Sequence, residues 1–145
     1  MANSAGISTS FKVELLTATH NFSSHSFKAA LYLASATITP ATTAYTATGE
    51  VSGTNYTAGG VDLTGSPDWI APTSTGTTAF TTPTANLVYT NVTLSTSFDA
   101  VLIYNTSATN KAVMVAVFGG QTITAGTFTL TMPTNDSSTA LIRLA

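Results

Sequence analysis

The residues of this 145-residue chain that carry reactive groups are few and scattered. His20 and His25 are the only histidines, and their spacing does not place two imidazoles on one face of a helix. Asp62 and Asp68 are six residues apart in an expected loop, and the other four acidic residues are scattered along the chain. Scattered carboxylates are usually solvated rather than paired for acid–base catalysis. We therefore predict no enzyme, no cofactor and no metal site, with turn or capping roles for the two histidines.

The stretch VSGTNYTAGGVDLT, residues 51–64, is the remaining candidate for chemistry, because glycines can expose backbone N–H groups to a phosphate. It lacks the lysine and the following helix of a P-loop, and also the spacing of a dinucleotide-binding motif. We favour a structural role, in which Gly53 permits a positive φ and Gly59 and Gly60 form a turn or bulge. Tyr56 then packs beside them or touches a neighbouring protein. A phosphate-binding nest is the alternative.

The composition excludes several classes of partner. Only 7% of residues are charged, against about 25% in typical soluble domains, and the net charge is -2. A chain without a basic stripe is not expected to bind nucleic acid. The sequence has neither an apolar run long enough for a membrane span nor the pattern of a signal peptide, so we expect cytoplasmic synthesis and no membrane partner. The lack of cysteine excludes disulfides and zinc–thiolate sites.

Serine and threonine take the place of the charged residues and make up about a third of the chain. Free monomers usually stay dispersed through surface charge, so a hydroxyl-rich surface is better suited to a protein that is covered by neighbours. The composition therefore favours a component of an assembly, and we expect a homo-oligomer, either a dimer or a trimer.

The sequence divides into an N-terminal arm, residues 1–9, and a single domain, residues 10–145. The arm is small, polar and aperiodic, and we expect it to be flexible. The next segment, SFKVELLTATHNF, predicts a short helix capped by Ser10. A strand is the alternative, because Phe11, Val13 and Leu15 also alternate.

Most of the domain predicts strands. Residues 27–33 alternate with strand period, and shorter candidates lie at 44–48 and 60–63. Five further runs are NLVYTNVTL, FDAVLIYN, KAVMVAVF, TFTLTMP and TALIRLA. Turn-forming residues separate them at 95–97, 105–110, 119–120, 125–126 and 135–138. The second and third runs predict a hairpin, and the whole predicts an all-β fold, a jelly-roll-like antiparallel β-sandwich.

Trp69 is the only tryptophan and lies in GSPDWIAP, a loop bounded by prolines. In such a loop it either anchors an interface together with Ile70 or covers the core of the sandwich. The sequence alone supports both roles equally.

Four segments, FKVELLTATHNF, SFKAALYL, TTAYTATGEVSGTNYTAGG and FDAVLIYN, carry a resemblance to a known family. Over residues 10–105 the chain resembles small virion proteins of tailed bacteriophages and cyanophages. The resemblance implies a structural protein of the virion, above all a capsid cement or decoration protein on the capsid surface, with the major capsid protein as partner. A position in the neck, tail or baseplate is also consistent with it.

On this hypothesis we expect partner contacts in the arm and in two loops. The residues are Ala2, Ser4, Ile7, Thr54, Tyr56, Trp69 and Ile70. A carbohydrate-binding adhesin is an alternative, in which Trp69, Tyr56 or Tyr45 stacks on sugar rings. A small hydrolase is a third hypothesis, and it lacks an acid–base pair in the sequence.

Overall fold

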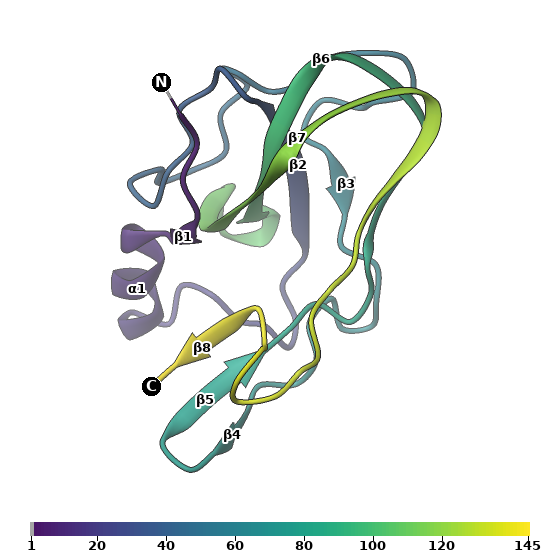
Figure 1. Cartoon of the computed structure of the whole chain (residues 1–145). Coiled ribbons are helices and arrows are strands. Elements are labelled where there is room, and N and C mark those ends of the chain that lie inside the picture. Colours follow the sequence, from purple (N-terminus) through teal and green to yellow (C-terminus); the bar gives the residue numbers. More distant parts are fainter. Residues whose placement is uncertain (1) are drawn as a thin grey trace.

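A computed structural model describes residues 2–145, which form two antiparallel sheets and one α-helix (Figure 1). The larger sheet has the order β1-β7-β6-β2-β3. Its strands are β1 Gly6–Ile7, β2 Phe27–Leu33, β3 Val61–Asp62, β6 Leu87–Asn105 and β7 Lys111–Leu130. The smaller sheet has the order β4-β5-β8, with β4 Thr73–Thr75, β5 Thr78–Thr81 and β8 Ile142–Leu144. The predicted mainly β, antiparallel class is confirmed.

Strands β6 and β7 form one long hairpin around a short 3-10 helix, η1 Thr106–Ala108. The predicted connection at 105–110 is therefore confirmed. The turns predicted at 95–97, 119–120 and 125–126 are wrong, because these residues lie inside the two strands, where the pairing register shifts. Glycine and other small residues form bulges within strands as readily as turns between them.

The central part of the larger sheet, where β2 pairs with the second half of β6, is buried on both faces. Phe27 and Leu31 of β2 belong to the main core on one face. Ala30 and Tyr32 of the same strand belong to a second cluster, which is completed by residues of the connection after β2 such as Ile38. A strand covered on both faces loses the alternation of apolar and polar residues, as the sequence predicts for the central hairpin. Among the shorter strand predictions, β3 confirms 60–63, whereas 44–48 forms no strand and contributes an isolated bridge.

Helix α1, Thr9–Leu16, confirms the predicted helix and excludes the strand alternative. It begins earlier than predicted: the N-cap residue is Ser8 rather than Ser10, and the Ser8 side chain makes no capping hydrogen bond. Phe11 is completely buried in the main core, while Val13 and Leu16 point away from it and are exposed. The apolar contact of Phe11 thus holds the helix against the sheet.

Candidate functional sites

A buried polar cluster joins α1 to the central hairpin. His20 Nε2 lies 2.7 Å from Glu14 Oε2, and His20 Nδ1 lies 3.0 Å from Asn105 Nδ2. The other oxygen of Glu14 accepts a hydrogen bond from Lys111 Nζ at 3.0 Å. His25 Nδ1 lies 2.9 Å from the same Asn105 nitrogen. The two histidines therefore converge on one asparagine at the end of β6. His25 also closes a turn with Asn21, in agreement with the turn role predicted for it, because its N–H donates to the carbonyl of Asn21 and its Nδ1 accepts the N–H of Asn21.

The orientation of Asn105 fixes the positions of the protons in this cluster. Its Oδ1 accepts the backbone N–H groups of Ser107 and Ala108 at 3.0 and 3.2 Å. Its Nδ2 must therefore face the imidazoles and donate to both. As a result His20 is unprotonated at Nδ1, and its Nε2 carries the proton that it donates to Glu14. Both nitrogens of the His20 ring are therefore engaged within the cluster.

Burial raises the pKa of Glu14, but the hydrogen bonds from His20 and Lys111 and the positive charge of Lys111 outweigh it. The pKa of Glu14 therefore lies below its ordinary value, and its carboxylate is ionised at neutral pH. The prediction of solvated acidic residues is wrong for this side chain, which is 13% exposed, and holds for Asp62. Within residues 2–145, no group of three or more potential ligands is arranged to hold a metal ion.

Replacing Asn105 by alanine is expected to lower the free energy of unfolding by about 2–4 kcal/mol. Two imidazole nitrogens and two backbone N–H groups would lose their partner in a buried site. Urea unfolding followed by tryptophan fluorescence measures the loss. The matched control is Asn86→Ala, because Asn86 is exposed and accepts one hydrogen bond, from the N–H of Met132. Equal losses in the two variants would contradict the role assigned to Asn105.

The glycine-rich stretch packs against the larger sheet, and one of its backbone N–H groups binds the carboxylate of Glu50. Gly59 donates its N–H to Glu50 Oε1 at 2.7 Å. Gly59 and Gly60 have φ of +92° and +80°, in agreement with the predicted turn. Gly53 does not have a positive φ; it permits close approach, because a Cβ there would lie 2.0 Å from the carbonyl oxygen of Thr93. The N–H of Gly59 is thus already engaged by a carboxylate and is not free for a phosphate.

Tyr56 packs inward rather than toward a neighbour. Its hydroxyl donates to Glu50 Oε1 at 2.8 Å and accepts the N–H of Leu31 at 3.0 Å. Its ring is stacked on that of Tyr89, with 6.1 Å between centroids. Tyr45 donates to the other oxygen of Glu50 at 2.6 Å. Glu50 therefore accepts hydrogen bonds from Tyr45, Tyr56 and Gly59, and Tyr56 connects this group to β2 through Leu31. Tyr56 thus has a structural role within this framework of hydrogen bonds and is not part of the predicted contact surface.

Trp69 is completely buried, with Phe22 and Phe27 at 4.8 and 5.6 Å between ring centroids. Of the two roles considered for it, packing in the core is correct, and its side chain cannot reach a partner. The same burial removes Trp69 as a platform for a sugar ring. Its neighbour Ile70 is 38% exposed and stays available for contact.

The N-terminal segment predicted to be a flexible arm lies along the larger sheet in the described residues. Strand β1 pairs with β7, and Ile7 is opposite Met114. The side chain of Asn3 makes three hydrogen bonds with neighbouring parts of the chain. Ala2 and Ser4 are exposed, and Ile7 is half-buried. Of the three predicted contact residues of this segment, Ile7 therefore lies on the edge strand β1, whereas Ser4 donates its N–H to the carbonyl of Ile38 in the connection after β2.

The remaining predicted contact residues belong to other elements. Thr54 is exposed and forms an isolated bridge with Thr93 of β6. Ile70 donates its N–H to the carbonyl of Thr82, which directly follows β5. The exposed candidates thus belong to three separate parts of the fold.

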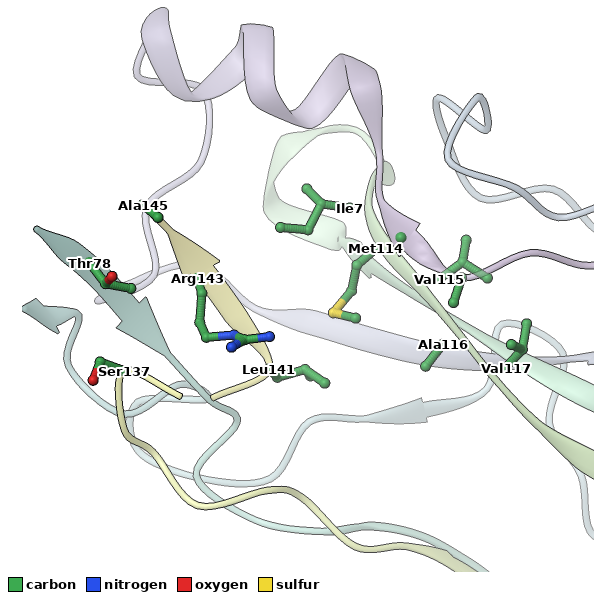
Figure 2. A pocket seen from close by; sticks show the side chains of 12 residues that line it. Ile7, Thr78, Met114, Val115, Ala116, Val117, Ser137, Leu141, Arg143 and Ala145 are labelled. Carbon is green, nitrogen blue, oxygen red and sulfur yellow. The ribbon is translucent and has the colours of Figure 1, made fainter. Parts of the chain in front are cut away.

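A cleft of about 690 Å³ lies between the edge of the larger sheet and the smaller sheet (Figure 2). Ile7 and the β7 residues Met114 to Val117 form one wall, and Leu141 and Arg143 form part of the other. Arg143 carries the only ionisable side chain among the lining residues, extends from β8, and donates to the carbonyl of Ser138. Of the predicted contact residues, Ile7 lines this cleft.

Comparison with known proteins gives no relative: no protein family, no curated protein and no solved structure matches the chain. Among residues 2–145, no helix is both long and apolar enough to cross a membrane. Arguments on function therefore rest on the residues themselves.

Proposed function

We propose that this protein is a capsid cement protein of a tailed phage, which binds the outer face of the assembled shell and bridges neighbouring major capsid subunits. One support is the resemblance to virion proteins of four segments that occur in the same order within residues 10–105. The other is a surface that is suited to uncharged contacts. The two antiparallel sheets are compatible with a sandwich, and a jelly-roll arrangement of their strands is part of the proposal.

The observation that carries the proposal is the extent of surface without charge. From Ala112 to Asn135 the chain has no ionisable side chain, although many of these residues are exposed on β7. Val117 on the same strand is 42% exposed. Contacts through hydroxyls, aliphatic groups and backbone bury little charge, so they avoid the desolvation penalty of ion pairs.

The mechanism of such a protein is thermodynamic. A ligand that binds only the assembled shell stabilises it by mass action, and it does so without changing the subunits. Several weak contacts on one protein add through multivalency when they engage adjacent subunits. Contact residues on separate parts of the fold, such as Ser4, Thr54 and Ile70, suit a protein that touches more than one subunit.

Removal of the protein from purified particles is expected to leave shells that burst at a lower temperature, and adding the purified protein is expected to restore the original value. Thermal release of DNA, followed with a fluorescent dye, measures this. Shells with unchanged stability would contradict a cement role. Copurification with detached tails at a few copies per particle would instead place the protein in the neck, tail or baseplate.

A matched pair of variants tests the predicted contact at Thr54. Thr54→Lys is expected to weaken rebinding to stripped shells by about tenfold or more, because an ammonium group would be desolvated at the interface. Thr75→Lys adds the same charge at an exposed threonine of β4, outside the predicted contacts, and is expected to rebind as the unmodified protein does. Equal weakening by both would indicate a general effect of charge and would remove Thr54 from the contact surface.

A further inference from the structure

The outer edge of β7 is long and largely unpaired. Strand β1 pairs with β7 only at Met114 and Val115, and beyond Val115 no other strand of residues 2–145 except β6 is paired with it. In Figure 1 this part of β7 arches away from β1 along the outside of the molecule. Backbone groups on such an edge are free to pair with another chain.

This edge lacks the features that usually prevent pairing between sheets. Natural edge strands commonly carry charged residues or proline. On β7, Lys111 is the only ionisable residue and lies at the paired end, and Pro133 is beyond the strand. Phe118, Phe128 and other apolar side chains of this strand pack on the core but are only partly buried. The edge therefore combines free backbone with apolar surface that is still accessible.

One stretch of the edge is regular and self-complementary. Ala125 has a φ of +46°, which interrupts the strand, and β7 ends at Leu130. The five residues from Gly126 to Leu130, GTFTL, have Phe128 at their centre. Antiparallel pairing of two such stretches about Phe128 places Thr127 opposite Thr129 twice and brings no like charges together.

We propose that two copies of this protein pair antiparallel through the outer edges of β7, around a twofold axis at Phe128, and form one continuous sheet. The occupant is a second copy because the edge has no charge to select a partner of opposite sign, whereas its sequence matches itself in this register. Threonine pairs directly across antiparallel strands are favourable, and the two Phe128 rings would lie side by side on the core face. The pairing does not rest on the capsid assignment.

The other sheet edges fit this role less well. Strand β3, at the opposite edge of the larger sheet, has two residues and carries Asp62, which lies 3.7 Å from Lys28 of β2. Strand β8 carries Arg143, and β4 has three residues. The part of β6 before Phe98 is also uncharged and is not paired with β2, but Thr54 bridges it at Thr93 and Asn55 donates to the carbonyl of Asn91. Among the strands of the described chain, β7 beyond Val115 is therefore the longest uncharged edge without such contacts.

Sedimentation equilibrium tests the pairing with the full chain. The unmodified protein is expected to sediment at twice its mass of 14.8 kDa. The double variant Thr127→Lys/Thr129→Lys places lysine opposite lysine twice, and its dimer is expected to be about tenfold weaker or more. Thr127→Glu/Thr129→Glu is expected to weaken the dimer by a similar factor, because it places glutamate opposite glutamate. An equimolar mixture of the two variants is expected to recover dimers, because glutamate then faces lysine.

The mixture separates loss of pairing from loss of folding, since an unfolded variant would not be rescued by its partner. Thr73→Lys/Thr75→Lys on β4 is the matched control and is expected to leave the dimer intact. A monomer or trimer of the unmodified protein, a lysine variant that stays dimeric, or a mixture without dimers would overturn the proposal. Loss of the dimer in the β4 variant alone would assign the interface to the smaller sheet.

Discussion

Replacing Gly60 by alanine is expected to prevent the chain from reaching its native fold, with a loss of at least about 4 kcal/mol in the free energy of unfolding. An added Cβ would lie 1.8 Å from the carbonyl oxygen of Ala29 and 2.7 Å from the Cα of Ala30. Both atoms belong to the backbone of β2, which pairs with β3 on one side and β6 on the other. Neither can move aside without breaking the sheet. Far-UV circular dichroism and urea unfolding measure the outcome.

Gly76→Ala is the matched control for this change. Gly76 also has a positive φ, +60°, but an added Cβ there meets no atom within 4 Å. The expected loss is about 1–2 kcal/mol, from the left-handed backbone alone. If Gly60→Ala folded with a stability close to that of Gly76→Ala, the close approach of the loop to β2 would not be needed for the fold. The comparison therefore separates the steric cost from the conformational one.

The elements were predictable where one local pattern determines them. The apolar runs on either side of 105–110 identify the central hairpin. Helix α1 was less determined, because Phe11 and Leu15 fit the period of a helix and that of a strand. Bulges were not predictable, because Gly119, Gly120 and Gly126 suit a turn as well as a bulge. Their role depends on whether β6 continues alongside, which is a property of the partner strand.

The buried polar clusters could not be predicted from the sequence for a different reason. Asn105 contacts His20 and His25 across separations of 85 and 80 residues, so nothing near the histidines indicates their common partner. Glu50 did leave a signal, because it is the single charged residue in a segment rich in tyrosine and glycine. An isolated carboxylate among hydrogen-bond donors in an uncharged segment is more consistent with an internal acceptor than with a solvated side chain.

Alkaline pH is expected to unfold this protein in one cooperative step, because the fold raises the pKa of all five tyrosines. Burial raises the pKa of Tyr45 and of Tyr104 to about 12, and Glu50 adds to both shifts. Burial raises the pKa of Tyr32, Tyr56 and Tyr89 further still. Each hydroxyl also donates a hydrogen bond that its ionised form would lose.

The direction of the pH dependence of stability follows from whether the folded or the unfolded state binds more protons. An unfolded tyrosine loses its proton near pH 10, whereas the folded side chains keep theirs to about pH 12 or above. Stability is therefore fully present below about pH 10 and falls as the pH rises further. Five tyrosines together give a slope of up to roughly 7 kcal/mol per pH unit, which is comparable to the whole stability of a domain of this size.

Parallel titrations by tyrosinate absorbance and far-UV circular dichroism are expected to give coincident, steep transitions between about pH 10 and 12. Tyr45→Phe removes one of the five protons, so the slope is expected to fall, by at most about 1.4 kcal/mol per pH unit because Tyr45 is partly exposed and solvent screens part of its shift. Tyrosinate that forms gradually while the dichroism stays native would mean that the hydroxyls ionise within the folded protein. In that case the hydrogen bonds of the tyrosines to Glu50 and to β2 would not be needed to keep the sheet intact. That outcome would contradict the structural role assigned to Tyr56.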